Sequence, residues 1–321
     1  MTPLHPDQWL DVIDREYLRS FVKDGGSAVK FAACFDKSSF KHVDQRLGEH
    51  GATAGYLVAR ADSRKRKISS IDDVFFALAS SVNWNEFSER LILNLAFTKG
   101  YRSPEKSPGS LSARLAAANG VEPTVIGLEV RQLLATHVFR HKLVPRDLRV
   151  AMLQLALAVW SGGAESEEAS SKIGDWLTGA NRSVTPVKQY QIRTRISRSN
   201  ARYFLSGFSH LLRLSGWSGF LLIIDGRQLA NSRRQTGSDL HYTKAAVLDS
   251  YEVARQFVDG IDKMDGALVA YLLERSFIED SARGLGAYPA LEYRIVDEVR
   301  DPMNPNPLSA LTALSLEAAD V

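Results

Sequence analysis

A lysine and a serine stand at the start of a predicted helix, where side chains of these types can contact phosphate groups. The segment AVKFAACFDKSSF (28–40) has the pattern of an apolar strand that runs into a helix, and Lys37 and Ser38 follow the strand. A phosphate-binding loop of the form G-x-x-x-x-G-K-[ST] also needs glycines, which let successive backbone N–H groups close around the phosphates. These glycines are missing, and Asp36 places a carboxylate directly before Lys37. The segment therefore carries half of the groups that a nucleotide site needs.

An aspartate ends the most strand-like run of the chain, GFLLIIDG (219–226). In P-loop ATPases an aspartate in this place holds the magnesium ion, and the next residue, often glutamate, activates the attacking water. Here Gly226 follows Asp225, so the water-activating group is missing. Lys37, Ser38 and Asp225 are the predicted nucleotide-contacting residues, with ATP and Mg²⁺ as ligands if the site is intact, and no catalytic residue is predicted. A structural role for Asp225, as a turn cap or an arginine partner, is the alternative.

Two basic runs follow the ends of predicted strands. Loops at the carboxyl ends of parallel strands face the ligand crevice of an open sheet, where basic side chains can contact phosphate or a nucleic-acid backbone. The alternative is that both runs are simply solvated. The predicted nucleic-acid-contacting residues are Arg64, Lys65, Arg66, Lys67, Arg227, Arg233 and Arg234.

Two further arginines, Arg283 and Arg294, follow the predicted strand ALVAYLLE (267–274). In multi-subunit ATPases arginines beyond such a strand can sense the nucleotide of their own or a neighbouring subunit. Structural salt bridges are the alternative for both.

Composition indicates a globular protein without a membrane span. The chain has 321 residues, of which 45% are hydrophobic and 24% charged, so it can bury a sizeable core. No apolar run reaches about 18 residues, and the N-terminus lacks the pattern of a signal peptide, which favours a cytoplasmic protein. The single cysteine, Cys34, lies in an apolar run and predicts a packed thiol. His137 and His141 are four residues apart but lack a third ligand, so no metal site is predicted.

The order of the predicted elements favours an α/β fold. Apolar runs at 28–34, 55–62, 219–226 and 267–274 predict buried strands, and most of residues 71–216 is predicted to be helical, with loops at 102–110 and 161–170. A strand, a helix and a strand within about 35 residues predict parallel pairing. The predicted fold is a P-loop NTPase-like parallel sheet with helices on both faces and a large helical insertion between strands two and three. The predicted domains are a core over 1–70 and 217–310, the insertion over 71–216, and a C-terminal tail over 311–321.

Several segments together resemble a family, the P-loop ATP-binding proteins of bacterial phage-defence islands, and in particular the BREX-system ATP-binding proteins. They are EYLRSFVKDGGSAVKF, GYLVARAD, ISRSNARYFLSGFSHLLRLSGWSGFLLIID, YTKAAVLDSYEVARQFVDGID and RGLGAYPALEYRIVDEVRDPMNPNPL. The resemblance covers about residues 8–310 and rests on the order and spacing of the segments.

The chain departs from this family at two positions. The resemblance implies a glycine-rich loop ending in Gly-Lys-Thr/Ser where this sequence has CFDKSSF, and Asp-Glu where it has Asp225-Gly226. Lys30, in GGSAVK, lies before or within the strand and cannot substitute for the loop lysine.

These departures favour a catalytically degenerate subunit. The resemblance implies a scaffold or adaptor in a BREX-like, methylation-linked defence complex, with other proteins of that system, such as an intact ATPase paralogue, and DNA as partners, and no membrane. One alternative is an ATP-binding protein or ATPase with an atypical phosphate loop. The other is a DNA-binding module.

Overall fold

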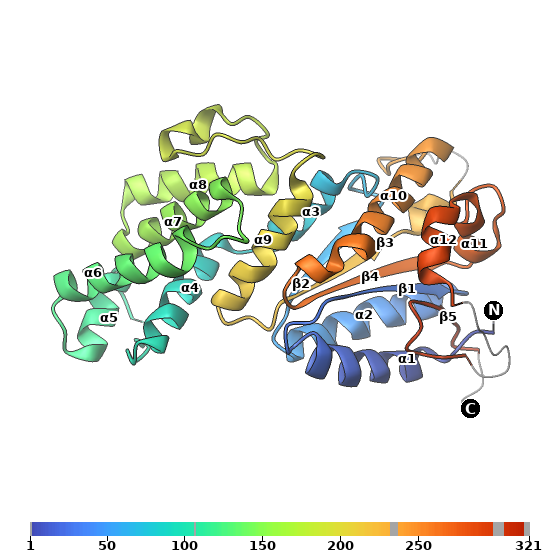
Figure 1. Cartoon of the computed structure of the whole chain (residues 1–321), viewed down its shortest axis with the longest axis horizontal. Coiled ribbons are helices and arrows are strands. Elements are labelled where there is room, and N and C mark those ends of the chain that lie inside the picture. Colours follow the sequence, from blue (N-terminus) through green and yellow to red (C-terminus); the bar gives the residue numbers. More distant parts are fainter. Residues whose placement is uncertain (1, 106, 232–236, 298–304, 318–321) are drawn as a thin grey trace. The chain divides into compact units, whose positions relative to one another are not determined.

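The chain folds into two compact units, a sheet unit that contains residues 1–81 and 218–321 and a helical unit over Val82–Trp217. The computed structural model describes residues 2–105, 107–231, 237–297 and 305–317 (Figure 1).

The sheet unit contains five parallel strands. They are β1 (Ala28–Cys34), β2 (Leu57–Asp62), β3 (Phe220–Asp225), β4 (Ala267–Glu274) and β5 (Leu311–Leu314), in the order β2-β3-β4-β1-β5. β3 and β4 lie inside the sheet, and their apolar residues do not alternate with polar ones because both faces are covered. The predicted α/β fold with a parallel sheet is therefore confirmed.

One prediction about the C-terminus is wrong. Residues 311–321 were expected to form a tail, but Leu311–Leu314 pair with β1 as the edge strand β5. All four residues of β5 are buried, so the segment LTAL gains its strand structure from packing and from a ladder with a partner far away in the sequence.

Helices cover both faces of this sheet (Figure 1). On one face, α1 (Pro6–Val12), its π-helical continuation η1 (Ile13–Phe21) and α2 (Lys37–Thr53) share one buried apolar cluster with the strands. On the other face, α10 (Lys244–Gly260) packs Phe257 against Tyr271 of β4. The remaining helices of the unit are α3 (Ile71–Ser80), α11 (Ser276–Glu279) and α12 (Pro289–Ile295), with 3₁₀ turns at Arg227–Ala230, Ile261–Lys263 and Leu285–Ala287.

The helical unit lies between β2 and β3 in the sequence. Its α-helices are α4 (Trp84–Thr98), α5 (Leu111–Asn119), α6 (Pro123–Leu134), α7 (Arg146–Ser161), α8 (Ala164–Thr178) and α9 (Ala201–Leu214), with a π-helical turn η2 (Ala135–Phe139) and a 3₁₀ turn η3 (Thr185–Tyr190). The loop expected over 161–170 is wrong, because only Gly162 and Gly163 separate α7 from α8. The acidic residues that suggested a loop instead stand in the first turn of α8, where the helix dipole favours them.

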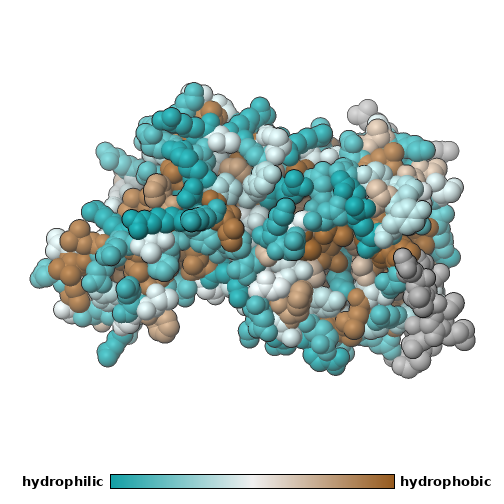
Figure 2. Space-filling model, viewed as in Figure 1, coloured by the Kyte–Doolittle hydropathy of each residue, from teal (hydrophilic) through white to brown (hydrophobic). Residues whose placement is uncertain are grey.

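The surface is mostly hydrophilic on the face that Figure 2 shows, with apolar groups near α5 and α6. On α6, Val125 and Leu128 are exposed. No helix among the described residues is long and apolar enough to cross a membrane.

Lys30 lies within β1, as expected, and its side chain is buried. Its Nζ donates to the carbonyl oxygens of Leu308 (2.6 Å) and Ser309 (3.2 Å) and lies 4.3 Å from the centre of the Tyr17 ring. Burial lowers the pKa of Lys30 from 10.5 to about 8. The lysine therefore holds the chain before β5 against β1, although its charge loses contact with water.

We expect this lysine to make the protein more stable as the pH rises from about 8 towards 10.5. Between these values the unfolded chain binds a proton that the folded protein does not, so the free energy of unfolding increases with pH. Between pH 7.5 and pH 10 the gain should be about 2 kcal/mol relative to Lys30→Met, measured by urea unfolding. Comparison with the variant cancels the contribution of the other titrating groups. A difference in the free energy of unfolding between the two proteins that is equal at both pH values would contradict the prediction.

Candidate nucleotide site at the C-terminal edge of the sheet

The carboxyl ends of the parallel strands bring the predicted nucleotide-contacting residues to one edge of the sheet. β3 ends at Asp225, β2 ends beside it at Asp62, and β1 leads through Phe35 and Asp36 into α2. Open parallel sheets bind their ligands at such an edge. The segment of Lys37 and the strand that ends at Asp225 therefore share this edge, as the sequence predicted.

The connection between β1 and α2 has only two residues, and the second one caps the helix. Asp36 is the N-cap of α2, and its Oδ1 accepts a hydrogen bond from the backbone N–H of Ser39 at 2.7 Å. Its Oδ2 accepts from the hydroxyl of Ser39 at 2.5 Å. A helix N-terminus attracts anions because its first N–H groups have no partner within the helix. Here a carboxylate of the chain itself takes that place.

The end of β5 holds this cap from the other side. The hydroxyl of Ser315 donates to Asp36 Oδ2 at 3.2 Å, and the hydroxyl of Ser39 accepts from the backbone N–H of Leu316 at 2.8 Å. Burial alone would raise the pKa of Asp36, but the hydrogen bonds from Ser39, Ser315 and Leu316 outweigh it and lower the pKa. The carboxylate is therefore charged at neutral pH.

Lys37 and Ser38 are the first two residues of α2, and both side chains are exposed. A phosphate group that used the N-terminus of α2 would have to displace Asp36, whose charge repels it. Breaking an N-cap alone costs about 1 kcal/mol, and the two-residue connection offers no loop of backbone N–H groups in return. The geometry thus brings a lysine and a hydroxyl to the correct helix without a cradle for a triphosphate.

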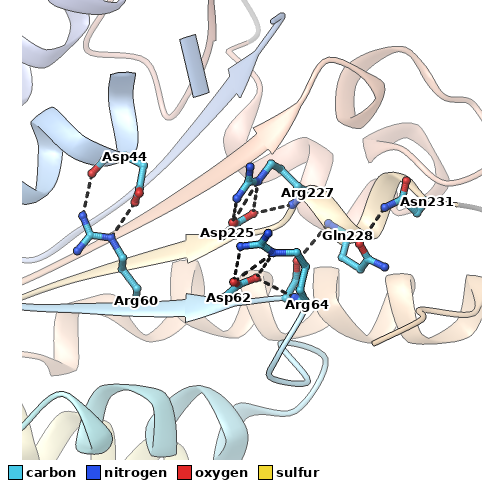
Figure 3. Close-up of polar contacts among 9 residues, drawn as sticks. Asp44, Arg60, Asp62, Arg64, Asp225, Arg227, Gln228 and Asn231 are labelled. Carbon is cyan, nitrogen blue, oxygen red and sulfur yellow. Dashed lines mark hydrogen bonds and ion pairs between the residues drawn. The ribbon is translucent and has the colours of Figure 1, made fainter. Parts of the chain in front are cut away.

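The carboxylate of Asp225 forms an ion pair with the neighbouring Arg227 (Figure 3). The guanidinium of Arg227 donates from Nε to both carboxylate oxygens at 3.1 Å and from Nη2 to Oδ2 at 2.6 Å. The backbone N–H of Arg227 donates to Oδ1 at 3.0 Å. The guanidinium carbon also lies 4.2 Å from the centre of the Phe40 ring of α2. The arginine partner that sequence reasoning gave as the alternative for Asp225 is therefore present.

The same arrangement recurs on the adjacent strand. Asp62 pairs in register with Asp225, and Arg64 binds its carboxylate through Nε and Nη2, the latter at 2.7 Å (Figure 3). Burial alone would raise the pKa of Asp62, but the hydrogen bonds and charge of Arg64, together with the charge of Arg227, lower it. The repeated Asp-x-Arg spacing after β2 and β3 is visible in the sequence and was missed as a signal for these pairs.

A third strand-end carboxyl group at this edge was also missed. Glu274 is the last residue of β4 and is half-buried. Burial raises its pKa, while the charges of Arg227 and Lys37 act in the opposite direction. Its position at the end of a buried strand was the available signal.

The basic loops divide into paired and exposed side chains. Arg64 and Arg227 are engaged with the strand-end aspartates, and Arg66 donates to the hydroxyl of Ser80 at 3.0 Å. Lys65 and Lys67 are exposed. Arg233 and Arg234 lie outside the described residues. The pairing neutralises two of the predicted phosphate contacts.

The two predicted sensor arginines contact the chain itself. Arg283 donates to the backbone carbonyls of Leu229 (3.1 Å), Asn231 (3.2 Å) and Tyr242 (2.9 Å), and so fixes the segment after β3. Arg294 binds Asp259 of α10 at 2.5 Å, which is the ion pair given as its alternative.

A small cavity lies at this edge between β3 and β4. The cavity lined by Gly226, Glu274 and Arg283 has a volume of about 10 Å³, close to that of one water molecule. Cys34 is buried, as expected, and burial raises the pKa of its thiol to about 12. Within the described ranges, no group of three or more His, Cys, Asp or Glu residues could hold a metal ion.

Fold and site together define an α/β protein whose five-stranded parallel sheet is compatible with a P-loop-like fold. The family of BREX system ATP-binding proteins BrxC/D matches residues 145–317, more than half of the chain, and the chain belongs to this family. This confirms the family resemblance predicted from the sequence. The match includes β3, β4 and β5, whereas β1 and the start of α2 lie outside it. Comparisons with curated proteins and with solved structures give no match.

Proposed function

We propose that the protein is a catalytically degenerate P-loop-like subunit that serves as a scaffold or adaptor in a cytoplasmic BREX-type phage-defence complex. The observation that carries the proposal is the N-terminus of α2, where Asp36 caps the helix and is held by Ser39 and Ser315. The pairing of Asp225 with Arg227 adds a second obstacle, because a magnesium-binding aspartate must be free of a bidentate arginine.

The partners in this proposal are other proteins of the defence system, including an intact ATPase paralogue. We interpret the helical unit as an insertion between the second and third strands of the core, which gives the subunit a surface separate from the sheet edge. Arg283 and Arg294 act as structural residues in this interpretation rather than as nucleotide sensors.

Nucleotide binding tests the degenerate site directly. Mg-ATP at 1 mM should leave the melting temperature unchanged, and Lys37→Ala should behave like Lys41→Ala, an exposed lysine on the same helix. A ligand present at one hundred times its dissociation constant would instead stabilise the fold by about 2.7 kcal/mol. The Lys37→Ala variant should also protect cells against phage as well as the unchanged protein does.

The second candidate function is an ATP-binding protein with an atypical phosphate loop. The family description favours it, since the BrxC/D family is described as ATP-binding. Micromolar Mg-ATP binding that disappears in Lys37→Ala and persists in Lys41→Ala would establish this function and refute the degenerate one. Nucleotide binding that is insensitive to Lys37 would point to a site elsewhere on the chain.

A further inference from the structure

The helical unit contains a groove of about 480 Å³ at the start of α7. Its walls are the connection between η2 and α7, the segment that leads to α9, and α9 itself. α9 closely approaches Pro145, the N-cap of α7, in this groove. A Cβ added to Gly207 of α9 would lie 2.4 Å from Cδ of Pro145. The volume lies in the range of pockets that hold small organic groups.

All but one of the residues that line the groove come from two stretches of sequence that contain no acidic residue. One runs from residue 130 to 146 and the other from residue 176 to 224. They bring Lys142, Arg146 and Arg193 to the lining, and all three side chains are exposed. Cations that converge on a concave surface create a positive potential that attracts a polyanion.

The one acid among the lining residues, all of them described, pairs with Arg146, so the net positive charge of the lining comes from Lys142 and Arg193. Asp147 is 4% exposed, and its carboxylate accepts hydrogen bonds from the backbone N–H groups of Arg193 and Thr194 and from the guanidinium of Arg146. Asp147 therefore holds the wall of the groove, and an incoming ligand meets Lys142 and Arg193.

An aromatic ring lies beside these cations. Tyr203, on α9, lines the groove and is 59% exposed, with the guanidinium carbon of Arg202 at 5.8 Å from its ring centre. Exposed aromatic rings among basic residues are the usual surface on which proteins stack the bases of a single strand, at about 1–3 kcal/mol per base. An acidic peptide would satisfy the cations, but its Asp and Glu side chains offer no aromatic ring to stack on Tyr203.

We propose that this groove binds single-stranded nucleic acid, with Lys142 and Arg193 at the phosphates and Tyr203 stacked on a base. The site is separate from the basic loops at the sheet edge and does not depend on whether α2 binds a nucleotide. An experiment can therefore refute this binding site without refuting the proposed function, and the reverse also holds.

Fluorescence anisotropy on the full chain tests the proposal with labelled dT20 and rU20. We expect Lys142→Glu/Arg193→Glu to weaken binding at least tenfold and to reduce the slope of log K against log salt by about two. The neutral pair Lys142→Gln/Arg193→Gln should weaken binding in the same direction and guards against misfolding of the charge-reversed pair. Tyr203→Ala should weaken binding about tenfold while leaving the salt slope unchanged.

The matched control is Lys41→Glu/Lys99→Glu, which changes the charge equally at two exposed lysines that do not line the groove. It should alter affinity by less than twofold. No binding at 50 mM salt, preference for duplex DNA or poly-glutamate over dT20 and rU20, or loss of binding in the control pair rather than the groove pair would each overturn the proposal. Preference between dT20 and rU20 distinguishes DNA from RNA as the natural strand.

Discussion

Replacing Asp147 with alanine should lower the free energy of unfolding of the helical unit by about 3–5 kcal/mol. The carboxylate stands near the start of α7 and accepts from the backbone N–H groups of Arg193 and Thr194 and from Arg146. Without it, two N–H groups lose their acceptor in a half-buried position, and each such loss costs about 1–3 kcal/mol.

This carboxylate also fixes the course of the chain between η3 and α9. Trp176 of α8 donates from its indole Nε1 to the carbonyl of Thr194 at 3.1 Å, so Asp147 and Trp176 hold the same segment from two helices. Loss of Asp147 removes one of these two contacts. We therefore expect the segment to loosen and nucleic-acid binding in the groove to weaken together with stability.

Urea unfolding followed by tryptophan fluorescence measures the effect, since four of the five tryptophans, Trp84, Trp160, Trp176 and Trp217, lie in the helical unit. Asp175→Ala is the matched control, because Asp175 is exposed on α8, and it should change stability by no more than about 0.5 kcal/mol. Equal effects of the two substitutions would show that the hydrogen bonds of Asp147 do not stabilise the unit.

The pH dependence of Asp147 gives a second measure of the same contacts. Burial alone would raise its pKa, but the hydrogen bonds from Thr194, Arg193 and Arg146 lower it below the ordinary value of 3.8. The stabilisation is therefore fully present above pH 3.8 and is lost as the pH falls through the lower pKa of the folded protein. The stability advantage over Asp147→Asn should shrink in that acidic range.

The sequence predicted the strands whose apolar composition is enough to indicate a buried strand. β3 and β4 are apolar up to their final carboxylate, and β1 is apolar apart from Lys30, which suits the interior of a parallel sheet. β5 has only four residues after a proline-rich segment, and it becomes a strand because it can pair with β1. Such pairing depends on residues far apart in the chain, which local patterns do not report.

The same distinction applies to the candidate site, because some of its features follow from local sequence and others from contacts between distant residues. Missing glycines before Lys37 are visible in the sequence, and so is the Asp-x-Arg spacing after β2 and β3. The cap at the N-terminus of α2 is not visible, because it needs Asp36 and Ser39 to meet Ser315 from the other end of the chain. The sequence thus shows that the loop glycines are missing, and the fold shows which side chains stand at the N-terminus of α2.

Replacing Gly219 with alanine should destabilise the sheet unit by about 4 kcal/mol or more, because two backbones meet at this residue. Gly219 precedes β3 with φ +136°, and a Cβ there would lie 1.7 Å from the carbonyl oxygen of Gly266. That oxygen accepts from the N–H of Phe220 at 3.0 Å, and the carbonyl of Gly219 accepts from Leu57 at 3.0 Å. The substitution therefore disturbs the pairing of β3 with β4 and with β2 where those ladders begin.

Gly237→Ala separates the clash from the cost of the backbone conformation. Gly237 has φ +142°, close to that of Gly219, but a Cβ there would meet nothing within 4 Å. Both variants strain the backbone by about 1–3 kcal/mol at most, so the difference between them reports the contact with Gly266. In thermal unfolding followed by circular dichroism, Gly219→Ala should melt about 8–16 °C below the unchanged protein, and Gly237→Ala much closer to it. Similar melting temperatures for the two variants would contradict the prediction, because they would show that the close approach of Gly219 to Gly266 does not constrain the starts of β3 and β4.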